Sequence, residues 1–290
     1  MRTYLEKFNL VSEINEMRFV RDLKMTCYST VYPFKIFDDD RIDLTFEPIT
    51  IFYGSNGSGK STLLNIIAEK TRVRRNAPFN SSAFFSDYVE RCSMQTRGIP
   101  MESRIMTSDD VFDYILDVRN INRGVDNKRN EYIDEYISYK GDRDKPFLLN
   151  SLDEFDEWKK AHLIRSGKQS ASSFVRENMN NNIDMHSNGE NAMKYFIDTI
   201  QNNALYLLDE PENSLSVEYQ LKLKEFLEDS ARHFNCQLII TTHSPVLLAM
   251  KGAKVYDLDS SPIQPKKWTE LDNVRRYFDF FEEHREEFFE

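Results

Sequence analysis

The segment Gly54-Ser55-Asn56-Gly57-Ser58-Gly59-Lys60-Ser61 constrains the fold of this chain more than any other. It follows residues 49–53, a short apolar run rich in β-branched and aromatic residues that is typical of a buried strand. It precedes residues 61–70, where apolar side chains at 63, 64, 66 and 67 predict a helix. Glycines let such a loop turn its N–H groups toward an anion beside a helix N-terminus. The segment therefore predicts a phosphate-binding loop.

The residue types in this loop point to a nucleoside triphosphate. Lys60 has the length to reach the β- and γ-phosphates, and the Ser61 hydroxyl is a ligand for Mg²⁺. A glycine-rich turn that matches by chance is the alternative, and the strand before and helix after disfavour it. The predicted nucleotide-binding residues are Gly54, Ser55, Asn56, Gly57, Ser58, Gly59, Lys60, Ser61 and Thr62.

A second apolar strand, residues 204–208, ends in two carboxylates, Asp209 and Glu210. Beside a phosphate-binding loop, Asp209 is expected to hold Mg²⁺ directly or through water. Glu210 is expected to act as the general base for the attacking water. Alone, the pattern would also fit a strand that ends in acidic turn residues.

His243 lies just beyond a third apolar strand, residues 237–241. Ligands of open α/β sheets bind at the C-terminal ends of the strands, where an imidazole can contact the γ-phosphate or the attacking water. A structural histidine is the alternative. His243 follows Glu210 by one helix and one strand, which favours the catalytic role.

A fourth motif, Ser187-Asn188-Gly189-Glu190, precedes a helical stretch at 192–200. A serine hydroxyl and unobstructed N–H groups at a helix start bind phosphate. The same residues could form an ordinary capping box, and both roles are compatible.

In this order, GSNGSGKST, SNGE, LYLLDEPENSLS and TTHS, the motifs resemble those of the ABC ATPase superfamily. The resemblance implies that Ser187, Asn188, Gly189 and Glu190 of one subunit contact the γ-phosphate held by the other, in a head-to-tail homodimer that closes on ATP. It also implies a Mg²⁺-sensing glutamine, which maps to Gln95. The predicted metal residues are therefore Ser61, Asp209 and Gln95.

Three positions depart from the transporter pattern: His186, Glu190 and Ser216. They make the chain more similar to the soluble SMC, RecF and OLD-type ATPases, including stand-alone ATPases of bacterial anti-phage systems. The Ser216 departure puts in doubt how tightly the two ATP sites communicate.

The expected fold is a single α/β domain of the ABC type, with a mixed, largely parallel sheet. Residues 1–108 and 201–261 are expected to form the nucleotide-binding lobe, and 109–200 an inserted helical lobe with the signature motif. The tail at 262–290 is predicted to be helical. We expect its aromatic side chains to pack on their own domain, with a partner-docking helix as the alternative.

Composition limits the partners and the compartment. The net charge of −10 argues against an overall electrostatic attraction to nucleic acid. Residues 70–75 are locally basic; we interpret them as a solvated face, with a nucleic-acid patch as the alternative. Three dispersed cysteines and the lack of an 18-residue apolar stretch predict a soluble, cytoplasmic protein without a membrane segment.

These observations predict a Mg²⁺-dependent ATPase whose cofactors are ATP and Mg²⁺. We expect ATP to close a dimer, hydrolysis to reopen it, and the cycle to act on a separate effector protein or a nucleic-acid-related process, for example in phage defence. Two alternatives stay open: the ATPase subunit of a membrane transporter, and a nucleotide-gated interaction module with negligible turnover.

Overall fold

The structure is a computed structural model that describes residues 2–23, 30–37, 43–141, 162–164, 166, 170–178, 187–213 and 215–289. It divides the chain into two compact units. The first is Met1–Phe112 together with Asn188–Glu290, and the second is Asp113–Ser187. Signature residue His186 and residue Ser214 lie outside the described residues.

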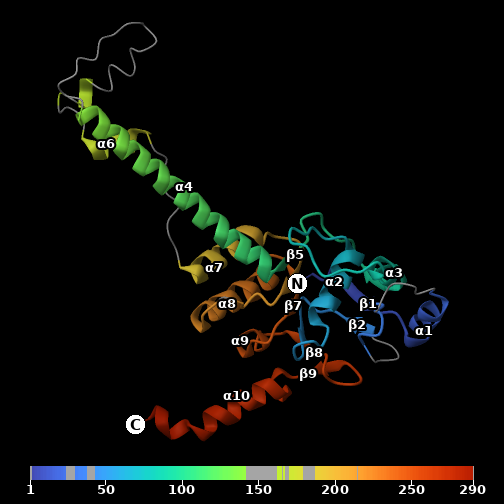
Figure 1. The fold of residues 1–290 in the computed structure, drawn as a ribbon. Helices are drawn as coiled ribbons and strands as arrows, with labels where there is room; N and C mark the ends of the chain where they lie inside the picture. The colour runs from blue at the N-terminus through green and yellow to red at the C-terminus, as the bar shows by residue number, and fades with distance from the viewer. Residues whose placement is uncertain are drawn as a thin grey trace. The chain divides into compact units, whose positions relative to one another are not determined.

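A six-stranded sheet forms the centre of the first unit (Figure 1). Its strand order is β5-β6-β7-β3-β8-β9, and all neighbouring pairs are parallel except β8 with β9. The strands are β3 (Ile49–Tyr53), β5 (Arg104–Thr107), β6 (Leu205–Asp209), β7 (Gln237–Thr241), β8 (Lys254–Asp257) and β9 (Gln264–Lys266). The predicted mixed, largely parallel sheet is confirmed.

Burial explains why the central strands carry almost no polar side chains. Every residue of β3 and β7 is buried, as are the first four residues of β6. A strand covered on both faces is mostly apolar, and its few polar side chains, such as Gln237 and Thr241, are hydrogen-bonded, because an unpaired polar side chain there would cost free energy. The three apolar runs of the sequence are therefore neighbours in one sheet.

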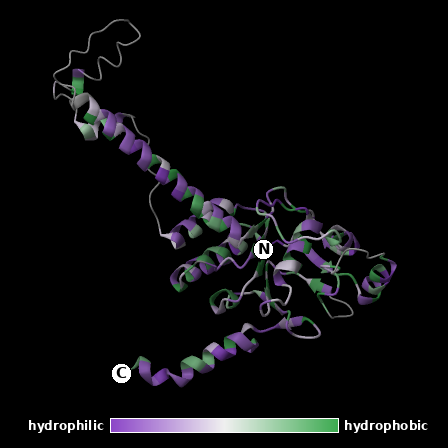
Figure 2. Cartoon of the chain, in the orientation of Figure 1, coloured by the Kyte–Doolittle hydropathy of each residue, from purple (hydrophilic) through white to green (hydrophobic). Residues whose placement is uncertain are grey.

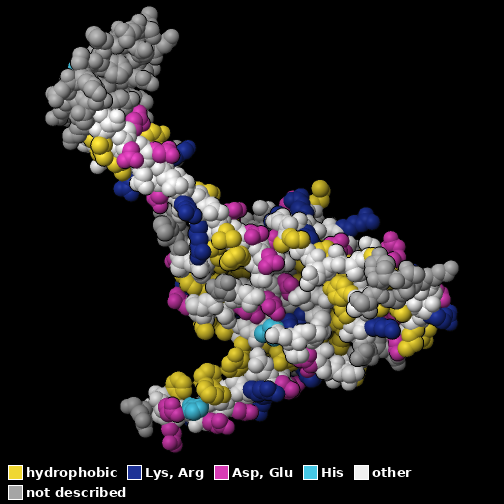
Figure 3. All heavy atoms as spheres, viewed as in Figure 1, with side chains coloured by type: hydrophobic (Ala, Val, Ile, Leu, Met, Phe, Trp, Pro, Cys, Tyr) yellow, Lys and Arg dark blue, Asp and Glu magenta, His cyan; other side chains and the backbone are white. Residues whose placement is uncertain are grey.

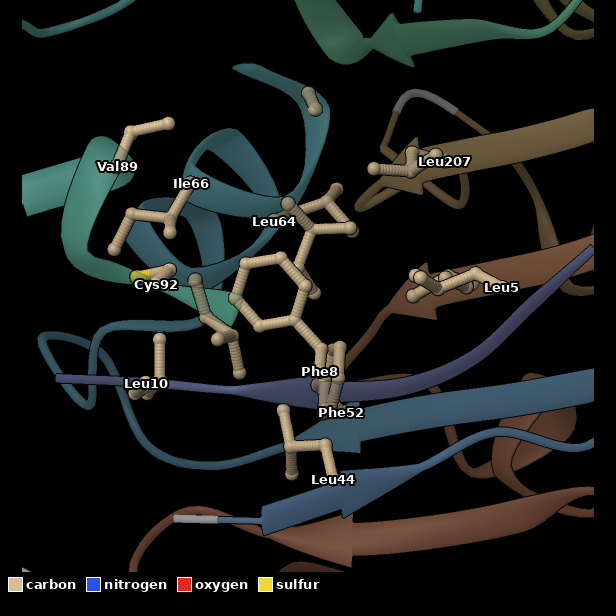
Figure 4. Packing of buried hydrophobic residues seen from close by; sticks show 14 of the residues in the cluster. Leu5, Phe8, Leu10, Leu44, Phe52, Leu64, Ile66, Val89, Cys92 and Leu207 are labelled. Carbon is tan, nitrogen blue, oxygen red and sulfur yellow. The ribbon is translucent and has the colours of Figure 1, made fainter. Parts of the chain in front are cut away.

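A second, antiparallel sheet has the order β2-β1-β4, formed by β1 (Leu5–Asn9), β2 (Asp43–Thr45) and β4 (Ser93–Thr96). The buried Gln237 amide joins it to β7: its Oε1 accepts hydrogen bonds from the N–H groups of Tyr4 and Leu5, at 2.8 Å each. Between the sheets lies the main apolar core, where Phe8, Leu44, Phe52 and Leu64 pack together (Figure 4).

The helices of the first unit flank these sheets. They are α1 (Glu13–Asp22), α2 (Lys60–Thr71), α3 (Phe85–Arg91), α7 (Asn188–Thr199), α8 (Val217–His233), α9 (Pro245–Leu248) and α10 (Asp272–Glu283). Short 3-10 turns, η2 (Trp268–Glu270) and η3 (Arg285–Phe288), precede and follow α10. Most of α2 is buried, which fixes the start of that helix against the sheet.

A long helix, α4 (Ser108–Gly141), begins in the first unit and continues into the second. The second unit also contains α6 (Ala171–Asn178) and a small core of Tyr136, Ile164 and Phe174. The ring of Phe174 lies 6.0 Å from that of Tyr136 and 6.2 Å from that of Tyr132. Among the described helices, none combines the length and apolar character needed to cross a membrane.

Candidate functional site

Two glycines of the loop between β3 and α2 have no room for a side chain. Gly59 has a φ of +89°, and a Cβ there would lie 2.9 Å from Ile36 Cγ2. A Cβ on Gly54 would lie 2.4 Å from Ser58 Oγ. The loop therefore packs closely against the Ser58 side chain and the segment that carries Ile36.

Lys60 is the first residue of α2, and its side chain is buried inside this loop. Its Nζ donates to the carbonyl oxygens of Gly54 and Ser55, at 3.1 Å each. Burial lowers the pKa of Lys60, while the nearby Glu210 and Asp209 carboxylates raise it. An ammonium group held in this way has donors to offer a phosphate.

Ser61 and Asp209 meet although they are 148 residues apart in the sequence. The Ser61 Oγ donates to Asp209 Oδ1 at 3.0 Å, and the Thr241 Oγ1 donates to the same oxygen at 2.5 Å. Burial raises the pKa of Asp209, and these two hydrogen bonds lower it. A hydroxyl and a carboxylate are the hard oxygen ligands that Mg²⁺ prefers.

No group of three or more His, Cys, Asp or Glu side chains forms a metal site within the described residues. A Mg²⁺ ion in a nucleotide site takes most of its ligands from phosphate and water, so two protein oxygens suffice. The donor set at Ser61 and Asp209 therefore fits Mg²⁺.

Glu210 has a backbone φ of +47°, in the left-handed region that a non-glycine residue rarely adopts. Its N–H is held by Thr241, with the carbonyl oxygen at 3.0 Å and Oγ1 at 3.1 Å. A backbone of this kind costs about 1–3 kcal/mol and is common at functional sites. It directs the Glu210 carboxylate between Lys60 Nζ at 3.8 Å and His243 Nε2 at 3.4 Å.

His243 contributes a side-chain nitrogen that is ready for a ligand. Its Nε2 is buried and has no hydrogen-bond partner among the described residues. Burial, and then the Lys60 charge, lower the pKa of His243, and Glu210 partly opposes them. The imidazole is therefore neutral at neutral pH.

Glu212 is a site residue that the sequence patterns did not single out. Its Oε1 accepts hydrogen bonds from Thr242 Oγ1 at 2.5 Å, His243 N at 2.9 Å and Ser244 N at 3.2 Å. The carboxylate thus ties the turn after Glu210 to the backbone that carries His243. A glutamate two residues after a general base has no periodic or capping signature, so only the folded structure identifies it.

Two cavities adjoin the loop. One, of about 580 Å³, is lined by Lys60, Glu210 and the glycines of the loop, and also by Tyr32 and Ile36. The Tyr32 hydroxyl lies 3.1 Å from Thr62 Oγ1. The segment at 30–37 therefore forms one wall of the nucleotide cavity, although no motif predicted it.

The second cavity, of about 450 Å³, is lined by Ser61 and Asp209 and by residues 107–109, where the chain enters α4. Gln95 is not among its lining residues; it lies on β4, opposite Lys7 of β1. The role of Gln95 in sensing Mg²⁺ stays a prediction. Ser108 and Asp109 are polar residues that line this cavity together with Ser61 and Asp209.

The signature residues are placed at the start of α7, which begins at Asn188. A Cβ on Gly189 would lie 2.7 Å from Tyr219 Cδ2, so this turn packs closely on α8. Asn188, Gly189 and Glu190 do not line the two cavities at the loop. The structure therefore does not bring them to the P-loop of their own chain.

The basic stretch at 70–75 is engaged within its own domain. Lys70 Nζ donates to the Glu90 carbonyl oxygen at 3.0 Å, and Arg74 pairs with Glu102 at 2.9 Å. Arg75 is largely buried and stacks over the ring of Phe79 at 4.3 Å. These contacts favour a structural role for the stretch over a nucleic-acid patch.

Comparison with solved structures gives distant similarities. The chain is 14% identical to the Smc head domain from Pyrococcus furiosus bound to the C-terminal domain of ScpA, covering 97% of this chain and 99% of that one, with a TM-score of 0.45. A second Smc head, bound to the ScpA winged-helix domain, is 17% identical over 88% of this chain and 94% of that one, with a TM-score of 0.43. A dimeric ATP-binding cassette bound to ADP and phosphate is 14% identical over 80% and 91%, with a TM-score of 0.36.

No curated protein matches the sequence significantly. A family model described as AAA ATPase domain matches residues 185–248. The model described as ABC transporter matches residues 37–213, more than half of the chain, including the phosphate-binding loop and both carboxylates after β6. The chain therefore belongs to the ABC family and is an ABC-class P-loop ATPase.

Proposed function

We propose that two copies of this protein bind ATP and Mg²⁺ between them, and that hydrolysis at Glu210 reopens the pair. The observation that carries the proposal is the position of Glu210, whose carboxylate lies between the loop lysine and His243, next to the Ser61–Asp209 pair. A phosphate bound at Lys60 would place its terminal group beside a general base and a buried imidazole nitrogen.

Each residue of the site has a distinct task. Lys60 exchanges its two carbonyl partners for phosphate oxygens, and Ser61 and Asp209 hold Mg²⁺, which when bound neutralises charge on the phosphates. Glu210 orients the attacking water and accepts its proton. His243 Nε2, buried without a hydrogen-bond partner among the described residues, contacts the γ-phosphate or that water.

The active unit in this proposal is a head-to-tail homodimer. Ser187, Asn188, Gly189 and Glu190 seal the γ-phosphate of the opposite copy, since a helix start with a serine and a glycine offers N–H groups to an anion. Differential binding of ATP to the closed pair supplies the free energy for closure. The resulting cycle drives a separate effector protein, as in stand-alone ATPases of bacterial anti-phage defence.

Cysteine chemistry supports a reducing, cytoplasmic setting. Cys92 and Cys236 are free and buried, and burial raises the pKa of Cys92 to about 12 and that of Cys236 to about 11. Thiols of this kind are unreactive core side chains and form no disulfide framework.

A membrane-transporter ATPase is the second candidate, because the matching family model is the one described as ABC transporter. Stable co-purification with a membrane permease would favour it. A nucleotide-gated module without turnover is distinguished by a phosphate-release assay on the purified protein.

The test uses Glu210→Gln. We expect phosphate release to fall by about 10²–10⁴, the usual contribution of a positioned general base, while ATP binding is kept. Sedimentation with Mg²⁺ and ATP should then show a stable dimer, which also serves as bait for an effector. Glu218→Gln, an exposed glutamate on α8, is the matched control. A Glu210→Gln protein with wild-type turnover, or one that stays monomeric with saturating ATP, would contradict the proposal.

A further inference from the structure

The C-terminal helix carries an apolar stripe that its own domain covers only at the start. Leu271 and Val274 are buried. The same face continues at helical spacing with aromatic residues that are exposed, including Phe278 at 57%, Phe281 at 52% and Phe288 at 67%. The expectation that the aromatic tail packs on its own domain is thus met only in the first turn. Figure 2 marks the apolar positions along this helix by hydropathy, and Figure 3 shows apolar side chains on its surface.

The exposed rings contact one another and the tail's own charges. Phe281 lies 5.5 Å from Phe280 and 6.2 Å from Phe288, and the Arg275 guanidinium lies 5.6 Å from the Phe278 ring. Six rings that each offer on the order of 100 Å² make an apolar surface on the order of 600 Å². That area approaches the ~800 Å² that one partner contributes to a standard protein interface. We name this surface the aromatic stripe; it comprises Tyr277, Phe278, Phe280, Phe281, Phe288 and Phe289.

Charge around the aromatic stripe identifies what can cover it. Residues 272–290 contain seven carboxylates and three arginines, Arg275, Arg276 and Arg285, so this segment is net negative. A second copy would bring the same negative charge against it, and like charges across an interface are unfavourable. The complementary occupant is a protein groove with an apolar floor and a rim of lysine and arginine, which takes an amphipathic helix through anchors at i, i+3, i+4 and i+7.

The beginning of α10 is built into the nucleotide site. The Asn273 N–H donates to the Tyr53 hydroxyl at 3.1 Å, and Asn273 Nδ2 donates to the His243 carbonyl oxygen at 3.3 Å. A cavity of about 450 Å³ is lined by Ser55 and Asn56 of the loop, by His243, and by residues 272, 273 and 276 of the helix. A movement of the His243 backbone would therefore change the hydrogen bond of Asn273 in the first turn of α10.

We propose that the aromatic stripe is the docking site for a partner protein with a basic-rimmed apolar groove, and that Asn273 couples its occupation to the state of the nucleotide site. Docking rests on the stripe alone, whereas the coupling rests on the proposed function. Binding linkage is reciprocal. A partner groove that binds the ATP-bound protein more tightly therefore increases the affinity of the protein for ATP by the same factor.

Docking is tested on the full-length protein with a defined probe, a labelled amphipathic helical peptide of leucine and lysine. A leucine and glutamate peptide of the same length is the charge control. We expect the lysine peptide to bind, and Phe278→Ser with Phe281→Ser to weaken it at least about tenfold, as loss of interface anchors does. Ile14→Ser with Met17→Ser, which removes two exposed apolar side chains from α1, is the matched control and should bind as the wild type does.

Coupling is tested in the Glu210→Gln background. Mg²⁺ and ATP should change the peptide Kd by about fivefold or more, the usual range of coupling between sites, and Asn273→Ala should abolish that change. If ATP closes the dimer but leaves the peptide Kd unchanged, the coupling is wrong and the proposed function stands. If the peptide binds the aromatic stripe but ATP forms no dimer, the proposed function fails and docking stands.

Three results would overturn the docking proposal. First, nucleotide-free protein could self-associate through the aromatic stripe. Sedimentation would then show dimers for the wild type and none for the variant with Phe278→Ser and Phe281→Ser. Phosphatidylcholine vesicles could bind the wild type and not that variant, which would make the stripe a lipid-contacting surface. Equal peptide binding by wild type and variant would show that the stripe is not the binding site.

Discussion

At Glu212, three donors from residues 242–244 converge on a single carboxylate oxygen, and the other oxygen, Oε2, is buried without a partner in the described structure. Glu212→Ala would leave Thr242 Oγ1 and the His243 N–H without this acceptor, at a cost of about 1–3 kcal/mol each when buried, whereas the Ser244 N–H keeps Thr242 Oγ1 at 3.0 Å. It would also release the His243 backbone. We expect kcat to fall by about ten- to a hundredfold, as small misplacements of catalytic groups do. Steady-state phosphate release measures this, with Glu218→Ala as control.

Glu212→Gln tests whether Glu212 acts through the hydrogen bonds it accepts or through its charge, because the amide keeps an acceptor oxygen for the three donors. We expect its kcat to stay within about threefold of wild type, since the geometry is retained. Burial raises the pKa of Glu212 above its ordinary value of 4.5, so stability falls as the pH rises from 4.5 to the raised pKa, and the full cost of the ionised form is present above it. Glu212→Gln should therefore raise Tm at pH 7, by roughly 2–4 °C per kcal/mol, and the gain should vanish below pH 4.5. An equal loss of activity in the alanine and glutamine variants would contradict the positioning role.

At the scale of elements, α7 can pack closely on α8 because Gly189 has no side chain. Gly189→Ala adds a Cβ 2.7 Å from Tyr219 Cδ2, and the overpacking should destabilise the protein by about 1–3 kcal/mol. Adding Tyr219→Ala should recover at least about 1 kcal/mol, since contacting sites are non-additive. Gly124→Ala in α4 has no atom within 4 Å of the new Cβ, and it should stabilise by about 0.5–1 kcal/mol. Thermal unfolding checks all three, and an additive double variant would show that the two helices do not clash.

Local sequence patterns predicted the helices and strands that position the site residues. The order of the strands in the sheet depends on contacts between residues far apart in the sequence. Apolar runs at 49–53 and 237–241 and the helix after the loop follow from short-range periodicity. The strand order is not encoded locally, because β3 lies between β7 and β8, which come some 200 residues later in the chain. Nor does any pattern predict the left-handed backbone of Glu210, whose N–H donates hydrogen bonds to Thr241 of β7.

Some of the site residues could also be predicted from local patterns, and others could not. The motif spacing predicted that Ser61, Asp209, Glu210 and His243 would meet, because parallel strands present their C-terminal ends at one edge. Tyr32 reaches the loop from a segment without a motif, and Asp109 lines the same cavity as Asp209. The position of Tyr32 depends on how the chain folds back over the sheet, which sequence spacing does not describe.

For the whole molecule, the proposed head-to-tail pair divides each ATP site between two copies. The loop, the two carboxylates and His243 come together in one chain, whereas the start of α7 does not line their cavities. If the signature acts across a symmetric pair, each ATP site combines a loop from one copy with Ser187 and Gly189 from the other. Complementation between two inactive variants tests that division directly.

Lys60→Ala disables the loop and keeps the signature, whereas Ser187→Asp keeps the loop and places a negative charge where phosphate is expected. Each should be inactive alone. The two variants are mixed without nucleotide and then given Mg²⁺ and ATP. Random pairing should make half of the pairs mixed, each with one intact site, so phosphate release should recover to about one quarter of wild type. The double variant mixed with wild type should rescue nothing and should instead lower activity, because every mixed pair then lacks an intact site. No recovery in the first mixture, despite subunit exchange shown by sedimentation, would mean that the signature acts within its own chain and that the head-to-tail pair is wrong.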